Sequence, residues 1–343
     1  MKRFLNTLFV TSDDIYLSLH DENVEALKDK KSLQKVPLQN LENIISFSYK
    51  GASPALLGEC AKRHIGFSFM TPNGKFLARI AGQDNGNIIL RKSQYRISDN
   101  KEASLKIARL IITAKIYNAR SVIMRALRDH ALSVDEKKFG EVVKSMLSSA
   151  RAAIDSGDGN TLRGIEGDAA RAYFSVMDDM ILQNKKKIYF HGRSRRPPKD
   201  PFNAMLSFAY TLLSHDCACA AEAVGLDSYA GFLRRDRPGR ESLALDLMEE
   251  LRSIYADRVV LSLINNRVVD GKDFKMMENG AVLMSDDARK KFISKWQERK
   301  RSEITHPFLE EKIPWGLVPY TQALLMARFI RGDIEAYPPF MWK

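Results

Sequence analysis

The chain has 343 residues, of which 45% are hydrophobic and 28% charged, so it is long and apolar enough for two domains with cores of their own and is not an intrinsically disordered chain. Its formal net charge of +12 points to a polyanionic partner. No apolar run approaches the roughly 18 residues that a membrane-spanning helix needs, so we expect that partner to be nucleic acid and not a membrane.

Two features of the sequence bear on cellular location. The first fourteen residues begin like a signal peptide, but their apolar part is short, ends at Asp13 and Asp14, and lacks a small-residue cleavage site. The three cysteines, Cys60, Cys217 and Cys219, have no zinc-type spacing, and an odd number does not make a disulfide framework. We therefore expect a cytoplasmic protein.

The first ninety-odd residues favour β-structure. Short apolar or alternating runs are separated by turn signals such as Asp21-Glu22-Asn23. One helix interrupts the strands, since Ser53 can cap it and Pro54 fits its first turn. We expect a small β-rich domain over residues 1–95 that serves packing or dimerisation, because it carries no catalytic cluster. The expected strands cover residues 4–9, 15–19, 44–47, 65–70 and 76–80, and the helix covers 53–63.

Between residues 92 and 101 the hydrophobic period changes from about two to about 3.6 residues, which indicates a change from strands to helices. Asp99 or Asn100 can cap a helix that begins at Lys101. We expect an α+β protein in which an all-α-helical catalytic domain over 96–343 follows the β-rich domain, with one hairpin at 274–284. The expected helices cover 101–130, 136–155, 160–183, 201–224, 242–265, 286–302 and 316–331.

Residues 231–252, GFLRRDRPGRESLALDLMEELR, join an arginine-rich loop to a helix. Asp246 and Glu249 are three residues apart, so both carboxylates project from one face of that helix. A basic loop beside paired carboxylates suits a site where a divalent metal meets phosphate. The same pattern is also typical of a solvated acidic face, and the segment alone does not separate the two interpretations.

A second acidic residue stands out at Glu166, which lies between Gly164 and Gly167 inside an expected helix. Two interior glycines cost about 1 kcal/mol each relative to alanine, so their presence needs a reason. One reason is the close approach of another backbone or of a ligand on the Glu166 side. The other is a tight contact between helices to which Glu166 is incidental.

Three basic segments, 185–199, 234–240 and 289–301, together with the net charge predict a shared DNA-binding surface, although each alone is also typical of a solvated face. Each phosphate that such a surface neutralises adds a slope of about −0.9 to the salt dependence of affinity for duplex DNA. The arginines that we expect to position phosphates are Arg193, Arg195, Arg196, Arg235, Arg237 and Arg240.

The order and spacing of several motifs resemble the CRISPR-associated protein 1 family, the spacer-acquisition integrases, and most closely its subtype I-C members. The resemblance covers essentially the whole chain. The motifs that carry it are GIEG at 164–167, RRPPKDPFNA at 195–204, MLSF at 205–208, GLD at 225–227, GFL at 231–233, LDLMEE at 245–250, RGD at 331–333 and YPPF at 337–340.

The resemblance implies a β-domain followed by a helical catalytic domain, a homodimer, and assembly with CRISPR-associated protein 2. It implies an endonuclease/integrase that joins the 3′-hydroxyl of double-stranded protospacer DNA to the CRISPR repeat by transesterification. It also implies a bound Mg²⁺ or Mn²⁺, whose ligands fall on Glu166 and Glu249 with Asp246 in support. The family's histidine ligand falls on Arg234 in this chain.

Arg234 departs from the family pattern in a way that matters chemically. Arginine stays protonated and has no lone pair for a metal, and beside Glu166 and Glu249 it can pair with both carboxylates. No spacing argument brings His215 to the site as a substitute, and we expect His215 to be structural. We therefore expect weak metal binding and impaired chemistry, with the fold and DNA binding retained. A non-catalytic DNA-binding scaffold and a nuclease acting on branched DNA are the alternative functions.

Overall fold

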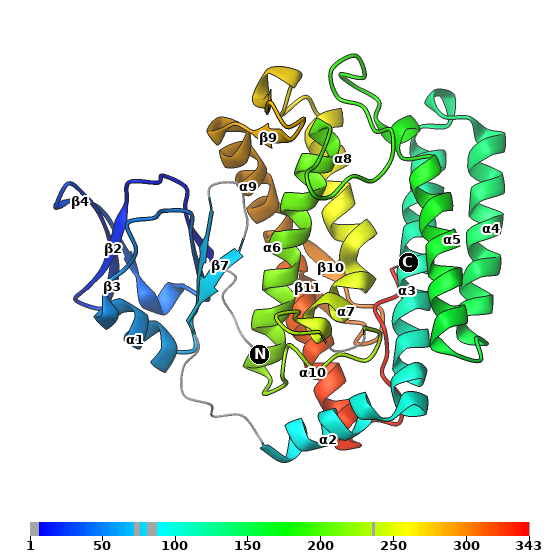
Figure 1. The fold of residues 1–343 in the computed structure, drawn as a ribbon, viewed down its shortest axis with the longest axis horizontal. Helices are drawn as coiled ribbons and strands as arrows, with labels where there is room; N and C mark the ends of the chain where they lie inside the picture. Colours follow the sequence, from blue (N-terminus) through cyan, green and yellow to red (C-terminus); the bar gives the residue numbers. More distant parts are fainter. Residues whose placement is uncertain (1–6, 72–75, 81–87, 235–236, 343) are drawn as a thin grey trace. The chain divides into compact units, whose positions relative to one another are not determined.

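The computed structural model describes residues 7–71, 76–80, 88–234 and 237–342 (Figure 1). The chain divides into two compact units: residues 1–85 with 289–301 form the first, and residues 86–288 with 302–343 form the second. Strands predominate in the first unit and helices in the second, which confirms the predicted α+β class. The domain ranges 1–95 and 96–343 stay a prediction.

The first unit contains two sheets. One has the strand order β1-β5-β6-β7, in which β1, β5 and β6 are parallel and β7 is antiparallel to β6. The other is an antiparallel meander in the order β2-β3-β4. Leu17, Ile44, Leu56 and Phe67 belong to the buried core between these elements. The elements are β1 (Thr7–Val10), β2 (Tyr16–His20), β3 (Asn23–Lys28), β4 (Lys31–Pro37), β5 (Asn43–Ser46), α1 (Pro54–Lys62), β6 (Gly66–Met70) and β7 (Phe76–Arg79).

Most of the expected elements of this unit are present, and the helix expected at 53–63 is confirmed as α1, whose N-cap Ser53 accepts a hydrogen bond from the Leu56 amide. Part of the first expected strand, residues 4–6, lies outside the described residues. The strands β3 and β4 were not predicted. Their connection is a two-residue turn in which Asp29 and Lys30 both have positive φ, a hairpin geometry that Asn-Gly or Asp-Gly usually signals.

The second unit is mostly helical. The hairpin expected at 274–284 is confirmed, whereas a second hairpin, β10–β11, and the helix α2 were not predicted. The elements are α2 (Ile88–Asp99), α3 (Lys101–Asp129), α4 (Glu136–Ile154), α5 (Gly159–Ser175), α6 (Pro201–Ala223), α7 (Ser242–Leu251), α8 (Arg258–Asn265), β8 (Phe274–Met276), β9 (Val282–Met284), β10 (Glu303–Thr305), β11 (Lys312–Pro314) and α10 (Val318–Arg331). The helix α9 (Asp286–Arg301) begins here, and its residues from 289 onward belong to the first unit.

Two expected helices are wrong in extent. The helix expected over 160–183 ends at Ser175, and a short 3₁₀ turn follows at Asp178–Met180. The helix expected over 242–265 is not uniform, because residues Arg252–Asp257 form a π-helix between α7 and α8. A π-helix has one more residue in each hydrogen-bonded ring than an α-helix, and single π-turns often occur at functional sites.

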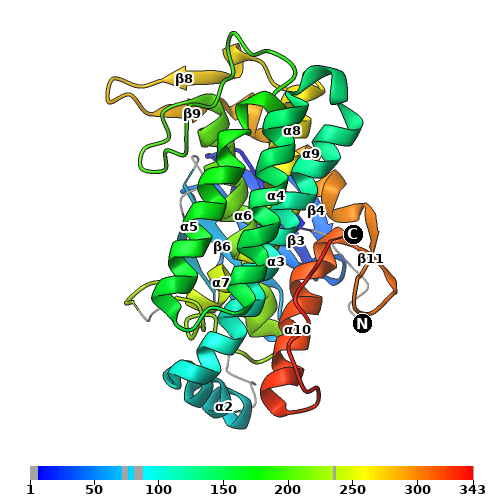
Figure 2. The same ribbon diagram turned by 90° about the vertical axis from the view of Figure 1, so that its right-hand side faces the viewer.

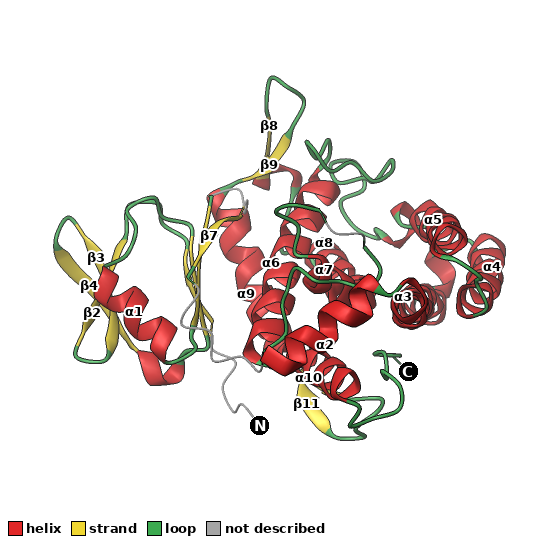
Figure 3. Ribbon diagram, turned by 60° about the horizontal axis from the view of Figure 1, so that its bottom comes forward, coloured by secondary structure: helices red, strands yellow, loops and turns green. Residues whose placement is uncertain are grey.

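The helices of the second unit pack in groups that place motifs from distant parts of the sequence side by side. In Figures 2 and 3, α3, α4 and α5 lie next to one another, and α6 and α7 lie on the other side of α3. The helix α6 is buried on nearly all sides and begins where Asp200 caps it through the Asn203 amide and Pro201 occupies its first turn. Among the described residues, no helix is both long and apolar enough to cross a membrane.

Candidate functional site

Glu166 projects from the middle of α5, whose N-terminus is capped by Asp158 through the amides of Asn160 and Thr161. A Cβ atom added at Gly164 or at Gly167 would meet no atom within 4 Å beyond its neighbours and the backbone of its own helix. The tight contact between helices that we considered for these glycines is therefore wrong for the described residues. An approach by a ligand stays a prediction.

The helix α7 carries Asp246 and Glu249 into the interior of the unit. Their side chains are 0% and 2% exposed, so the interpretation of this segment as a solvated acidic face is wrong. Buried carboxylates need hydrogen bonds or opposite charges, because burial without partners costs several kcal/mol. The partners of both come from residues that surround α7.

Asp246 holds the loop that enters α7. Its Oδ2 accepts hydrogen bonds from the amides of Phe232 and Leu233, at 2.8 and 2.9 Å. The loop passes so close that a Cβ at Gly231 would lie 2.7 Å from the same oxygen, so only glycine fits there. One oxygen of this carboxylate is thus committed to the backbone.

Arg234 follows directly in that loop and lies across both carboxylates of α7. Its guanidinium donates to Asp246 Oδ1 at 2.7 Å and forms an ion pair with Glu249 Oε1. Burial of the guanidinium lowers its pKa, but Glu249 and Asp246 outweigh that effect and raise the pKa above its usual value. The side chain at the family's histidine position is therefore a fixed, charged partner of the two acids.

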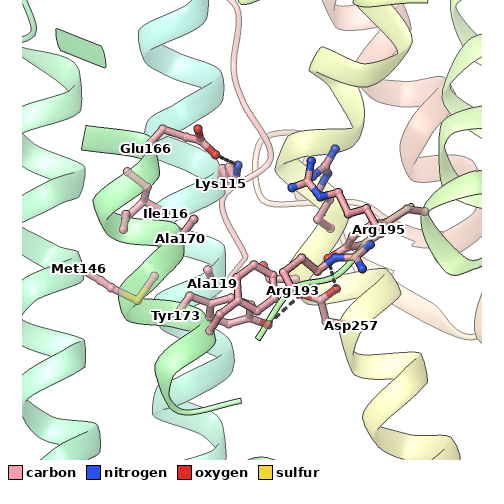
Figure 4. A pocket seen from close by; sticks show the side chains of 15 residues that line it. Lys115, Ile116, Ala119, Met146, Glu166, Ala170, Tyr173, Arg193, Arg195 and Asp257 are labelled. Carbon is pink, nitrogen blue, oxygen red and sulfur yellow. Dashed lines mark hydrogen bonds and ion pairs between the residues drawn. The ribbon is translucent and has the colours of Figure 1, made fainter. Parts of the chain in front are cut away.

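Lys115, on α3, connects the two helices that carry the glutamates. Its ammonium forms an ion pair with Glu166 (Figure 4). The same ammonium lies 2.9 Å from Glu249 Oε2. Sequence reasoning missed this residue. The signal that could have found it is a lysine inside the stretch from Ile111 to Ala119, where most neighbours are buried apolar residues of α3.

The charges of this cluster balance among the described residues. Three carboxylates, those of Glu166, Asp246 and Glu249, face three cations, because Arg252 also lies 3.2 Å from Glu249 and joins Lys115 and Arg234. Burial raises the pKa of Glu249, but Arg252, Lys115 and Arg234 together hold it below its usual range. For Asp246 burial is the larger effect and raises the pKa, although Arg234 and the two amides oppose it.

These residues do not fit the divalent metal that the family resemblance implies. Lys115 and Arg234 occupy the carboxylate oxygens that would face a cation, and one oxygen of Asp246 is bound by two amides. In the described part of the chain, no group of three His, Cys, Asp or Glu side chains lies close enough together to hold a metal ion. His215 is buried beside Cys219, with its Nε2 3.5 Å from that sulfur.

A cavity of about 60 Å³ adjoins Lys115 and Glu166 (Figure 4). The π-helix contributes Arg252, Ser253 and Asp257 to its wall, and the segment before α6 contributes Arg193 and Arg195. Its lining residues are Lys115, Ile116, Ala119, Met146, Glu166, Ala169, Ala170, Tyr173, Phe174, Arg193, Arg195, Tyr210, Arg252, Ser253 and Asp257. The cavity therefore joins the carboxylate cluster to part of the predicted basic surface.

Aromatic hydroxyl groups organise the far wall of this cavity. Asp257 accepts hydrogen bonds from Tyr173 at 2.9 Å and from Tyr210 at 2.7 Å, and burial raises its pKa to about 6. The Tyr210 ring lies 4.9 Å from the Arg252 guanidinium and 5.3 Å from that of Arg193, within the range of cation–π attraction. These contacts fix two guanidinium groups beside the cavity.

Of the described arginines that were predicted to position phosphates, two line the cavity and three do not. Arg193 and Arg195 line the cavity, and Arg193 is partly structural because it donates to Asn203 Oδ1 at 2.6 Å. Arg196 and Arg237 are exposed, and Arg240 lies 3.4 Å from Ser242 Oγ. Arg235 lies outside the described residues.

Comparison with known proteins identifies strong similarity over the full chain. The family model described as CRISPR associated protein Cas1 matches residues 8–298. The CRISPR-associated endonuclease Cas1 1 of Chlorobaculum tepidum is 48% identical over 343 residues, which cover 100% of both chains. The CRISPR-associated endonuclease Cas1 2 of Rhodospirillum rubrum is 46% identical over 353 residues, again with 100% of both chains covered.

Solved structures show the same fold at low sequence identity. A casposase bound to its integration product has a TM-score of 0.82 at 23% identity and covers 97% of this chain and 92% of that chain. A Cas1 protein from Thermotoga maritima has a TM-score of 0.81 at 19% identity, with 96% and 97% covered. A Cas6-RT-Cas1–Cas2 complex has a TM-score of 0.81 at 20% identity and covers 98% of this chain and 36% of that chain.

Proposed function

Since this chain belongs to the Cas1 family, we propose that it acts in CRISPR adaptation as the endonuclease/integrase subunit that binds protospacer and repeat DNA. Its full-length similarity to relatives named endonucleases supports this role, and its net charge of +12 suits a DNA ligand. The reaction that we propose is a transesterification, in which the 3′-hydroxyl of a protospacer strand attacks a phosphodiester of the repeat. A new phosphodiester forms, and the repeat strand is cut and released with a free 3′-hydroxyl. Membership of subtype I-C stays a prediction.

We propose two protein partners. The first is a second copy of this chain, paired through the β-rich residues 1–95. The second is Cas2, because one structural neighbour is a Cas6-RT-Cas1–Cas2 complex. Double-stranded DNA would lie along the basic surface, where Arg195, Arg196, Arg237 and Arg240 would bind phosphates, together with Arg193 and Arg235.

The single observation that supports our proposal for the reaction in this chain is the contact of Arg234 with both Asp246 and Glu249. With a neutral histidine in its place, three carboxylates would face only Lys115 and Arg252 among the described cations, and the negative charge left over would attract a metal ion. With arginine the cluster is neutral. We propose that the Mg²⁺ or Mn²⁺ of the family binds weakly here and that the chemical step is impaired while DNA binding persists.

The test is half-site integration with and without Mn²⁺, on this chain and on Arg234→His. We expect Arg234→His to bind Mn²⁺ and to increase the joined product at least about tenfold, in line with the effects of residues that orient metal ligands. The double variant Arg234→His with Glu166→Gln is the matched control and should lose that gain. Equal metal affinity and equal product for this chain and for Arg234→His would overturn the proposal.

A second candidate function, a DNA-binding scaffold without catalysis, is favoured by the charge balance of the cluster. It predicts retained DNA affinity with no joined product at any metal concentration, for Arg234→His as well. A third, a nuclease acting on branched DNA, uses the same residues and differs in substrate. It predicts cleavage of a branched duplex without any joined strand.

A further inference from the structure

The last residues of the chain fold back into the second unit. The helix α10 ends at Arg331, and the next residue, Gly332, has a φ of 81°, the left-handed conformation that stops a helix. The chain then runs back beside α10 as an irregular segment, red in Figure 2, that ends near α3. Tyr337, Phe340 and Trp342 of this segment are buried. We call residues 337–342 the C-terminal clip.

Glu250 on α7 binds the C-terminal clip from one side. Its carboxylate accepts hydrogen bonds from the Tyr337 hydroxyl at 2.7 Å, the Phe340 amide at 2.8 Å and the Gln322 amide group at 2.9 Å. Gln322, on α10, also donates to the Tyr337 oxygen at 2.8 Å and to the Pro338 carbonyl at 3.2 Å. The clip is therefore held by directional bonds from its own backbone as well as by apolar packing.

Asn118 on α3 binds the C-terminal clip from the other side. Its Nδ2 donates at 2.7 Å both to the Phe340 carbonyl and to the Glu250 carbonyl, and its Oδ1 accepts from the Trp342 amide at 2.8 Å. One amide side chain thus joins α3, α7 and the clip. It is fully buried and uses both donors and its acceptor.

The positions of Asn118 and Glu250 relate the C-terminal clip to the carboxylate cluster. Asn118 lies one helical turn beyond Lys115, and Glu250 directly follows Glu249. Lys115 and Glu249 are ion-paired at 2.9 Å across the same two helices. A displacement of α3 relative to α7 at the level of the clip would therefore change the separation of these two charged groups.

We propose that the C-terminal clip is a positioning segment, which holds α3 against α7 through Asn118 and Glu250 and so sets the distance of Lys115 from Glu249. Its bonds run to the neighbours of the cluster residues, so its effect on chemistry is indirect. The consequence for integration rests on the proposed function. The positioning of Lys115 does not rest on it. The positioning and its consequence for integration are therefore tested separately.

The first test measures the acetylation rate of Lys115 in the full-length chain by mass spectrometry. Asn118→Ala removes all three bonds of the amide side chain, and we expect Lys115 to react at least about fivefold faster, because an amine released from its carboxylates is more accessible. Lys138, which pairs with Asp179 at 2.6 Å, is the internal reference and should not change. Arg331→Gln is the control variant, since it breaks only the exposed pair with Asp333 at the end of α10.

Tyr337→Phe is a second variant for the same measurement, to be used if Asn118→Ala does not fold. It removes a single hydroxyl group from the C-terminal clip, and we expect a rise in the Lys115 rate of about twofold. Unchanged reactivity of Lys115 in a folded clip variant, as judged by circular dichroism and thermal unfolding, would overturn the proposal.

The second test measures integration in the Arg234→His background, well below the unfolding temperature of each variant. Tyr337→Phe should lower the joining rate at saturating DNA about three- to tenfold and leave the DNA dissociation constant unchanged. A purely structural contribution would leave the rate unchanged at that temperature, and that result counts against the proposal. Where Arg234→His gives no joined product, the proposed function fails, and the Lys115 rates still decide whether the C-terminal clip positions α3.

Discussion

Glu249 and Glu250 follow each other on α7 and are both buried, yet their surroundings are opposite. Three cations face Glu249, whereas the described partners of the Glu250 carboxylate are neutral donors. The cations hold the pKa of Glu249 below its usual range, while burial raises that of Glu250 to about 7 against the effect of its hydrogen bonds. Neighbouring side chains on a helix point about 100° apart. The same turn of α7 therefore has an ionic side, which carries Glu249, and a hydrogen-bonded side, which carries Glu250.

The comparison shows how a single helix serves two purposes. The ionic side of α7 meets Lys115 and Arg234, where the family resemblance puts the chemistry, and the other side meets the C-terminal clip. A buried ion pair contributes little net stability but is costly to break, whereas a satisfied network of neutral hydrogen bonds costs about 1 kcal/mol per bond removed. The two sides of α7 should therefore respond to substitution by different amounts.

The largest effect is expected on the ionic side, from Glu249→Gln. Lys115, Arg234 and Arg252 would lose the charge that they share, and we expect the free energy of unfolding at pH 7 to fall by about 3–5 kcal/mol. Urea unfolding measures it. Glu298→Gln, which breaks the exposed pair with Lys295, is the control and should change stability by less than about 1 kcal/mol. A loss below about 1 kcal/mol for Glu249→Gln would remove the contrast between the two sides.

Asp257 tests whether the pKa of a carboxylate bound by neutral hydroxyl groups shifts in the opposite direction to that of a carboxylate bound by cations. Its pKa is raised from 3.8 to about 6, mainly by burial, so the folded chain holds a proton that the unfolded chain has released between these pH values. The free energy of unfolding should fall as pH rises from about 4 to about 6, by at most about 3 kcal/mol for this group. The difference in stability between this chain and Asp257→Asn, measured from pH 4 to pH 7, isolates it. If the stability of this chain relative to Asp257→Asn rises with pH, the pKa of Asp257 is not raised by folding and the prediction is wrong.

Arg234→His sharpens the comparison by removing one cation from the ionic side. In metal-free buffer we expect the free energy of unfolding to fall by about 2 kcal/mol, because Asp246 and Glu249 lose a buried partner. Mn²⁺ at about a hundred times its dissociation constant should return about 2.7 kcal/mol to this variant and leave the parent chain unchanged. Thermal unfolding with and without Mn²⁺ measures both effects, and an equal shift in the parent chain would show that its site accepts metal as it stands.

The smallest effect is expected on the hydrogen-bonded side. Tyr337→Phe removes one hydroxyl group from Glu250 and Gln322, and we expect a loss of about 1 kcal/mol. Urea unfolding at pH 7 measures it alongside Glu249→Gln. If Tyr337→Phe costs as much as Glu249→Gln, the two sides of α7 are energetically alike.

The sequence predicted the elements that have local signals. Ser53 with Pro54 marks the beginning of α1, and Asn279-Gly280 marks the β8–β9 hairpin. The strand β4 was missed because its residues are mostly exposed and show no buried alternation. The π-helix was missed because its apolar spacing continues that of α7.

The candidate site was predicted only in part, for a physical reason. Glu166, Asp246 and Glu249 belong to local motifs, and Arg234 stands at a position defined by its neighbours in the sequence. Lys115 belongs to no motif. It comes to the cluster through the packing of α3 against α5 and α7. Its place among apolar residues of α3 indicates burial, but not which carboxylates it meets.

The π-helix at Arg252–Asp257 requires a set number of residues between α7 and α8. Deleting one of its residues would restore the α-helical period and rotate everything after it by about 100° relative to α7. Asp257 would then leave the hydroxyl groups of Tyr173 and Tyr210, although the contacts of Glu249 with Lys115 and Arg234 would not be altered directly. We therefore expect this stretch not to tolerate insertions or deletions, and alignments of its relatives to run through it without gaps.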